Sequence, residues 1–192
     1  MNPEDSRIQF ECIKCGACCR EEALLVTVTG RDIVRISMGL GLESSEVIRA
    51  FDFYLLSSSD SPEGLRDTPV VNTEQGPAHV ALKKMENGDC IFLKDNLCMI
   101  HTIRPMVCMS FPFVFWDGGD EKTWGLSAMK EICPGLGSGP EVEISDLREL
   151  ADAVLEDIAL FKEFAEEWNR NEENPTVEHL VDTILSDQRF TV

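Results

Sequence analysis

Basic side chains are scarce in this sequence of 192 residues. It has 17 Lys and Arg against 35 Asp and Glu, which gives a formal net charge of −18. Phosphate backbones and anionic membrane surfaces attract clusters of basic side chains and repel an acidic surface. We therefore expect neither nucleic acid nor a membrane as a partner, and we expect a protein partner instead.

A long hydrophobic run is also missing. No stretch approaches the roughly 18 apolar residues of a membrane-spanning helix, and the start, MNPED, lacks the basic and apolar segments of a secretory signal. We therefore expect a cytoplasmic protein, and the oligomeric state stays open. In that reducing compartment, clustered cysteines more often bind metal or take part in catalysis than form disulfides.

Motifs of the common enzyme classes are absent as well. The sequence has no glycine-rich phosphate loop, no nucleophile elbow and no nucleotide fingerprint. No catalytic residue is therefore assigned, and the sequence alone does not decide whether the protein is an enzyme.

What the sequence does have is cysteine, in a dense motif followed by four more. The motif is Cys12-x2-Cys15-x2-Cys18-Cys19. Thiolate is a soft ligand that suits zinc and iron–sulfur clusters, and a gap of two residues lets two cysteines meet one metal around a tight turn. All eight cysteines are candidate metal ligands: Cys12, Cys15, Cys18, Cys19, Cys90, Cys98, Cys108 and Cys133.

The adjacent pair Cys18 and Cys19 leaves three arrangements open, because neighbouring side chains tend to diverge. One cysteine ligates while the other packs, or the two serve neighbouring sites, or one is a free reactive thiol beside the metal. A stable zinc site needs four ligands and no more. Eight cysteines, enough for two adjacent sites and including an adjacent pair, favour iron–sulfur, with 4Fe–4S preferred, and zinc is the alternative cofactor.

Two further residues lie among the later cysteines. Arg104 is the candidate cofactor-binding residue, since its positive charge would offset the negative charge of a thiolate-ligated cluster; the alternative is an ion pair with one of the many acids. His101 could complete a mixed Cys/His zinc site, and the alternative is a partly exposed histidine without a metal role.

The pattern of apolar residues predicts an α+β fold: a small cysteine-rich metal-binding domain of short strands and helices, with a C-terminal helical extension. The domain covers residues 1–140, and the glycine-rich run at 135–139 is expected to be a linker. Residues 141–192 hold 15 acidic and 4 basic side chains, with apolar residues at steps of three and four. They predict an acidic extension packed on the domain, with helices over 145–170 and 176–187.

Within the first domain we expect short elements on either side of a long loop at 57–79. The expected elements, in chain order, are a strand at 24–28, helices up to residue 38 and over 45–55, a hairpin over 78–100 with a strand at 90–93 and a turn at Asp95-Asn96, helical turns over 103–110, and a hairpin over 113–127.

These motifs together resemble the YkgJ-type, CxxCxxCC cysteine-cluster family, which is described as a zinc- or iron-chelating domain. The resemblance rests on the CxxCxxCC motif, on the helix after it, and on two later blocks: Cys90-Ile91-Phe92-Leu93 with Cys98, and Arg104-Pro105-Met106-Val107-Cys108-Met109-Ser110-Phe111-Pro112. It implies a metal-chelating fold. Members are often labelled iron–sulfur oxidoreductases, and the domain occurs in flagellin lysine methylases.

Three functions follow as hypotheses. The first is an iron–sulfur protein in a redox, electron-transfer or protein-modification or maturation role. The second is a zinc-stabilised structural or protein-interaction module without catalysis. The third, which the resemblance alone implies, is metal-dependent transfer of a methyl or other group to a protein.

Overall fold

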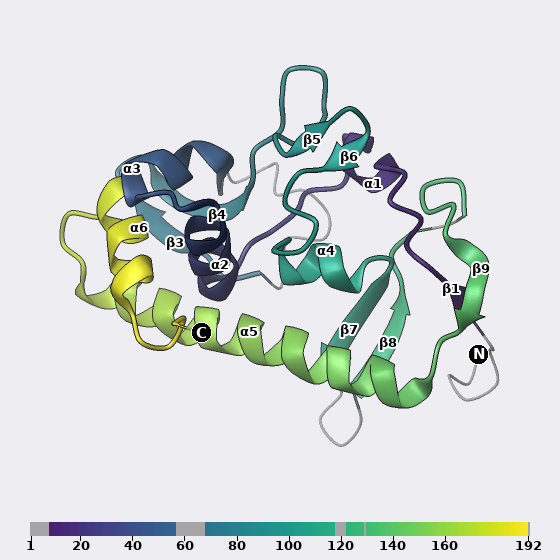
Figure 1. The fold of residues 1–192 in the computed structure, drawn as a ribbon. Helices are drawn as coiled ribbons and strands as arrows, with labels where there is room; N and C mark the ends of the chain where they lie inside the picture. The colour runs from purple at the N-terminus through teal and green to yellow at the C-terminus, as the bar shows by residue number, and fades with distance from the viewer. Residues whose placement is uncertain (1–7, 57–67, 118–121, 129, 192) are drawn as a thin grey trace.

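Helices and several small antiparallel sheets make up the chain, which confirms the predicted α+β class (Figure 1). The computed structural model describes residues 8–56, 68–117, 122–128 and 130–191. Within these ranges, no helix has both the length and the apolar character that crossing a membrane requires. Part of the predicted loop at 57–79 lies outside the described residues.

The largest sheet has three strands in the order β2-β4-β3, namely Phe51–Leu55, Gly76–Leu82 and Val71–Thr73. Its central strand, β4, is buried from residue 78 to residue 82, because it has a neighbour on both sides and a helical layer over it. The main core packs between this sheet and helices α2 (Gly30–Leu40), α5 (Ile144–Asn171) and α6 (Val177–Ser186). Its fully buried members include Ile33, Ile36, Val71, Phe161, Leu180, Ile184 and Phe190.

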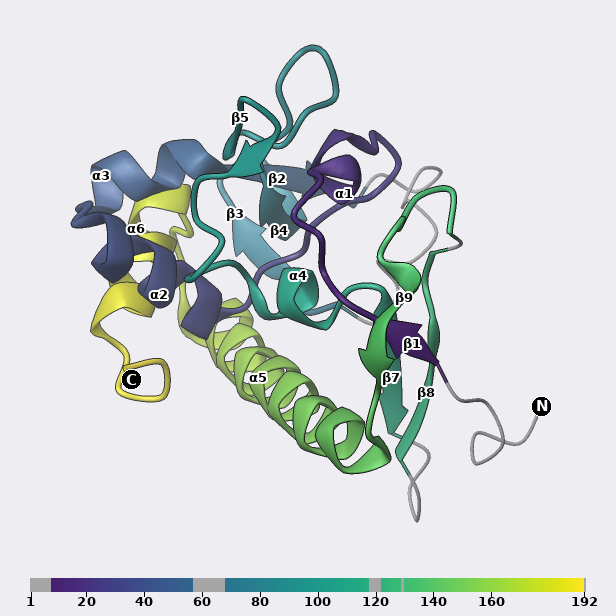
Figure 2. The ribbon, with the colours of Figure 1, turned by 45° about the vertical axis from the view of Figure 1, so that its right-hand side comes forward.

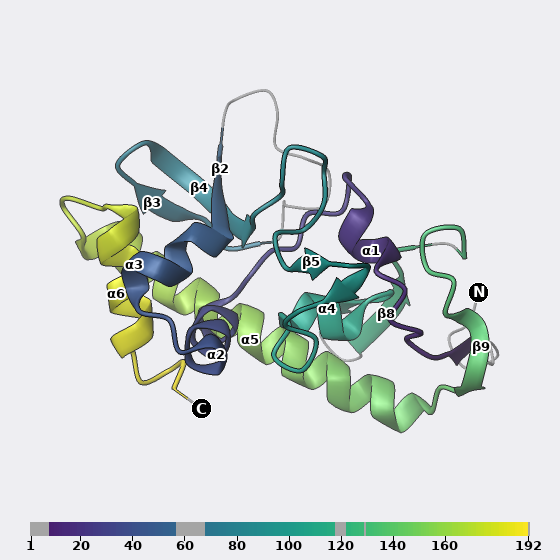
Figure 3. The same cartoon turned by 45° about the horizontal axis from the view of Figure 1, so that its top comes forward.

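Helices α5 and α6 confirm the two helices predicted from the C-terminal periodicity. Helix α5 runs along one side of the molecule and contacts α2, β3, α4 (Met106–Ser110) and β7 (Phe113–Asp117) (Figures 1 and 3). Its last turns hold the edge strand β3. The side-chain amide of Asn169 accepts from Asn72 N at 2.6 Å and donates to Val70 O at 2.7 Å, and Trp168 Nε1 donates to Asn72 O at 2.9 Å.

Two smaller strand pairs lie beyond the N-terminal half of α5 (Figure 2). Strands β7 (Phe113–Asp117) and β8 (Lys122–Leu126) form the predicted hairpin. Strand β1 (Gln9–Phe10) pairs with β9 (Leu136–Glu141). The prediction of a linker at 135–139 was therefore wrong: most of this run lies in β9, which pairs with the start of the chain. The boundary between domains at residue 140 stays a prediction.

Three other local predictions were wrong. The segment 24–28 is no regular strand, because only Thr27 forms a bridge to Ala81 of β4. The helix over 45–55 ends early: α3 (Ser44–Val47) and a 3-10 turn (Ile48–Ala50) lead into β2. The hairpin over 78–100 is two separate structures, since β4 pairs with β2 and β3. Of the strand at 90–93, only Leu93 belongs to β5 (Leu93–Lys94), which pairs with β6 (Leu97–Cys98).

The C-terminal segment packs against the start of α2, and this contact is testable. A Cβ atom added at Gly30 would lie 2.5 Å from Cζ of Phe190, whose ring is fully buried. We expect Gly30→Ala to destabilise the protein by about 1–3 kcal/mol, because overpacking outweighs the gain in helix propensity. Urea unfolding measures the change. The double variant with Phe190→Leu should recover part of the loss, and simple additivity of the two changes would contradict the proposed clash.

Candidate metal centre

The CxxCxxCC motif packs against the turn between β5 and β6, next to Cys98. Its last cysteines lie on α1 (Ala17–Arg20), and Gly16 begins this helix with a φ of 67°. A Cβ atom at Gly16 would lie 2.7 Å from the carbonyl oxygen of Asn96, in the β5–β6 turn. A residue without a side chain is therefore required here, both for the left-handed backbone and for the close approach.

Arg20 and a backbone hydrogen bond tie the cysteine segments together. The Arg20 guanidinium donates to Asn96 Oδ1 at 2.7 Å and to the carbonyl of Cys15 at 2.9 Å. The backbone N–H of Cys90 donates to the carbonyl of Cys19 at 2.8 Å. Segments that are 70 or more residues apart in the sequence thus meet around the motif. Figure 1 shows α1 beside β5 and β6.

Two cavities share a wall of cysteines at this place. The smaller, of about 80 Å³, is lined by seven cysteines, Cys12, Cys15, Cys18, Cys19, Cys98, Cys108 and Cys133. The larger, of about 410 Å³, is lined by Cys18, Cys19, Cys90, Cys98 and Cys108. Every cysteine that the sequence put forward as a ligand therefore borders one cavity or both. All eight are free thiols.

Three of the thiols are hydrogen-bonded to one another. Hydrogen bonds with Cys19 are the largest cause that lowers the pKa of Cys18 to about 7 and that of Cys98 to about 6. The same bonds raise the pKa of Cys19. Burial raises the pKa of Cys90 and of Cys108, and the negative charge of neighbouring cysteines raises it further. Some thiols of the cluster therefore lose a proton readily near neutral pH. The others lose theirs only when a metal cation takes the place of the proton.

Arg104 borders both cavities, next to this cluster. Its guanidinium donates to Nε2 of His101 at 2.7 Å and to the carbonyl of His101 at 2.9 Å. In the described part of the chain it forms no ion pair with a carboxylate, so the ion-pair alternative finds no support there. His101 also lines the smaller cavity, and its Nε2 lone pair is occupied by Arg104.

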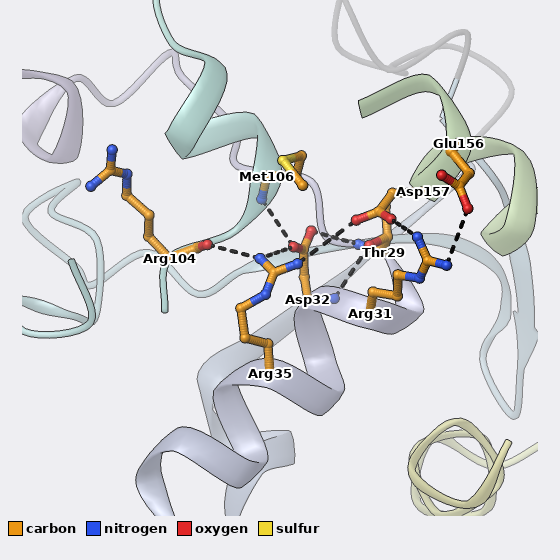
Figure 4. Close-up of polar contacts among 8 residues, drawn as sticks. All are labelled: Thr29, Arg31, Asp32, Arg35, Arg104, Met106, Glu156 and Asp157. Atoms are coloured by element: carbon orange, nitrogen blue, oxygen red, sulfur yellow. Dashed lines mark hydrogen bonds and ion pairs between the residues drawn. The ribbon is translucent and has the colours of Figure 1, made fainter. Parts of the chain in front are cut away.

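A buried ionic network, which the sequence did not predict, holds the segment before Cys108 (Figure 4). The carboxylate of Asp32, 1% exposed, accepts from the backbone N–H of Met106 at 2.9 Å and of Thr29 at 3.0 Å. Arg35 donates to Asp32 at 3.1 Å and to the carbonyl of Arg104 at 3.1 Å. The start of α2 thus orients residues 104–106, and burial outweighs these donors and raises the pKa of Asp32 to about 6.

Helix α5 enters the same network through Asp157, which is 3% exposed. One carboxylate oxygen accepts from Arg31 at 2.7 Å. The other lies 3.8 Å from Arg35 and has no hydrogen-bond partner among the described residues. Charged groups on α2 and α5 therefore meet under the cysteine-bearing segment, as Figure 4 shows.

The residues present fit a thiolate-bound metal by their chemistry. Across the described ranges, no three Cys, His, Asp or Glu side chains stand arranged around one ion. The fit rests instead on the donor set, because eight soft sulfur ligands border two adjoining cavities beside the positive charge of Arg104. Cys18 and Cys98 are hydrogen-bonded to Cys19, and binding a metal requires that these thiols lose their protons.

Comparison with known proteins gives one match. A family model named CxxCxxCC, with the description "Putative zinc- or iron-chelating domain", matches residues 11–134. This range contains all eight cysteines. No curated protein and no solved structure matches the chain.

The pH dependence of metal binding tests Arg104. After the hydrogen bond to Cys19, and one to the backbone of Ile100, the charge of Arg104 also lowers the pKa of Cys98. In Arg104→Met that pKa rises, so Cys98 holds its proton at higher pH. We expect zinc affinity to fall by up to about tenfold at pH 6–7 and to approach the wild-type value by pH 9. Arg104→Lys keeps the charge and should keep the profile. Identical profiles for wild type and Arg104→Met in competition titrations would contradict this role.

A matched pair of variants tests the ionic network. Asp32→Ala leaves the N–H groups of Thr29 and Met106 without their acceptor and takes the carboxylate partner from Arg35, and we expect a loss of about 3–5 kcal/mol in the free energy of unfolding. Glu156→Ala removes a partner of Arg31 whose side chain is 62% exposed, and it should cost at most about 1 kcal/mol. Urea denaturation compares the two, and equal losses would show that burial of Asp32 does not matter.

Proposed function

The chain belongs to the CxxCxxCC family of zinc- or iron-chelating domains, and on this premise we propose that it holds an iron–sulfur cluster, of the 4Fe–4S type, in the cytoplasm. The proposed role is in redox chemistry, either as electron transfer or in the modification or maturation of another protein. Binding of zinc or iron is the function that the family itself supports.

One observation carries the choice of an iron–sulfur cluster. Seven cysteines line the smaller cavity, and the eighth, Cys90, lines the larger cavity beside it. A zinc ion takes four ligands and a 4Fe–4S cluster takes four cysteines, so one site of either kind would leave half of these thiols without a role. Two neighbouring sites would use all eight, and a donor set of cysteines favours clusters, because zinc sites commonly include histidine or carboxylate ligands as well. Cys18 and Cys19, in the wall between the cavities, would then each serve one of the two sites.

The chain's own residues would hold such a group and protect it. Cysteines of the shared wall would supply thiolates, and the charge of Arg104 would offset theirs. Phe111, which borders both cavities, would exclude water from the sulfurs. When bound, an iron–sulfur cluster supplies one-electron transfer, with a potential that depends on its charge, its hydrogen bonds and its exposure.

A zinc-stabilised module is the second candidate. Its support is the family description, which names zinc, together with His101, which lines the smaller cavity beside the cysteines. For this function, His101 would have to release Arg104 or bind through Nδ1. The metal would then stabilise the fold and take no part in catalysis.

A redox role also requires a protein partner, which we place at the cysteine-bearing end. Three large apolar side chains next to the cysteines are exposed: Ile13 by 53%, Leu97 by 56% and Met99 by 61%. Ile13 follows Cys12 in the sequence, and Leu97 and Met99 flank Cys98. Apolar side chains exposed together around a functional group are a common feature of contact surfaces between proteins.

Metal and sulfide analysis tests the proposal directly. The protein is purified without oxygen after iron-replete expression, and iron, zinc and acid-labile sulfide are measured on the sample whose visible spectrum is recorded. We expect iron and sulfide in equal amounts with broad absorption in the blue. Stoichiometric zinc without colour would instead establish the zinc module.

A pair of neighbouring residues provides the mutational test. Cys98→Ser removes a sulfur from the wall that both cavities share, and we expect it to lose most of the bound metal and to lower thermal stability, because metal binding and folding are coupled in thiolate sites. Met99→Ser removes the adjacent, exposed sulfur and should keep both. If Cys98→Ser retained full metal and stability, its assignment as a ligand would be wrong.

A further inference from the structure

The larger cavity extends well beyond the cysteines that form one of its walls. Apart from the five cysteines, its lining is mostly apolar and comes from the segment 23–26, from the loop after β4, and from α4 and β7. Leu24, Leu25, Phe113 and Val114 belong to this apolar part. Segments from both halves of the cysteine-bearing chain thus enclose a space whose wall is sulfur in one part and hydrocarbon in the rest.

Metal binding would account for the cysteine wall of this space, but neither packing nor metal binding explains its apolar part. Protein interiors are close-packed, and few voids larger than a water molecule remain in them. About 410 Å³ lies in the range of roughly 300–1,000 Å³ that small-molecule sites occupy. The smaller cavity already brings seven cysteines together, so a metal does not require the apolar part of the larger one.

The chemistry of the lining indicates what would fill it. The chain has 35 acidic residues, yet no Asp or Glu is among the described residues that line this cavity. Apart from the cysteines, Arg104 is its one charged lining residue there, and its guanidinium is already hydrogen-bonded to His101. We propose that the larger cavity binds a small, uncharged organic ligand whose aliphatic chain or ring fills the apolar part, beside the cysteine wall.

Straight-chain alcohols from hexanol to dodecanol are suitable probes for this site. Calorimetric titration of the full-length protein, purified with its metal, should show saturable binding of one alcohol per chain. Each added CH2 group should tighten binding about fourfold while the chain still fits. Affinity should then stop rising, because a cavity of fixed size cannot enclose a longer chain. No saturable binding, or affinity that rises evenly up to dodecanol, would overturn the proposal.

Two variants on the same hairpin locate the site. Val114→Trp places a large side chain in the cavity and should weaken binding of the best alcohol at least tenfold. Leu126→Trp makes the same kind of change at an exposed position on β8 that does not line the cavity, and it should stay within twofold of wild type. Unchanged binding in Val114→Trp would overturn the proposal.

Metal content, measured on the same samples, separates this inference from the proposed function. Both variants should keep the wild-type amount of metal. If Val114→Trp does not fold, Leu25→Trp replaces it, and the chain-length series on the wild-type protein still decides. A protein that binds alcohols but contains no metal would retain this site and lose the proposed function.

Discussion

The carboxylate of Asp32 is buried where α2, α5 and the segment before Cys108 meet, and much of the arrangement around the cysteines depends on it. A buried charge costs several kcal/mol unless hydrogen bonds and an opposite charge offset that cost. Asp32 has both, from the N–H groups of Thr29 and Met106 and from Arg35. Because one carboxylate caps α2 and also holds residue 106, the helix start and the cysteine-bearing segment form a single unit.

The elements that could be predicted from the sequence are those with a strong local pattern. Helices α5 and α6 keep an apolar period of three to four residues along their length, and Asp95 and Asn96 form the predicted turn with φ of 50° and 63°. The prediction of a helix over 45–55 failed because the apolar positions of this region fit both a helix and a strand. The pairing of β2 with β4 decides between the two. The prediction of a linker at 135–139 failed because β9 pairs with residues more than 120 positions earlier. No local pattern in the sequence reveals a pairing over that distance.

The candidate metal centre could also be predicted only in part. The CxxCxxCC spacing indicated the first four cysteines as ligands, the other four were candidates without such a spacing, and the structure brings all eight to two adjoining cavities. The supporting network did not follow, since Arg31 and Asp157 are 126 residues apart. One signal was available: Asp157 lies within the apolar stripe of α5, between Val154 and Phe161. A charged residue at such a position indicates a buried partner, although the sequence cannot say which arginine it is.

The hydrogen bonds between the end of α5 and strand β3 also bear on self-association of the protein at high concentration. An edge strand with free N–H and C=O groups is a template on which another chain can add a strand, and repeated addition leads to fibres. Here Asn169 and Trp168 occupy backbone groups of residues 70 and 72. The acidic helix thereby protects this side of the sheet from self-association, quite apart from anything that the cysteines do.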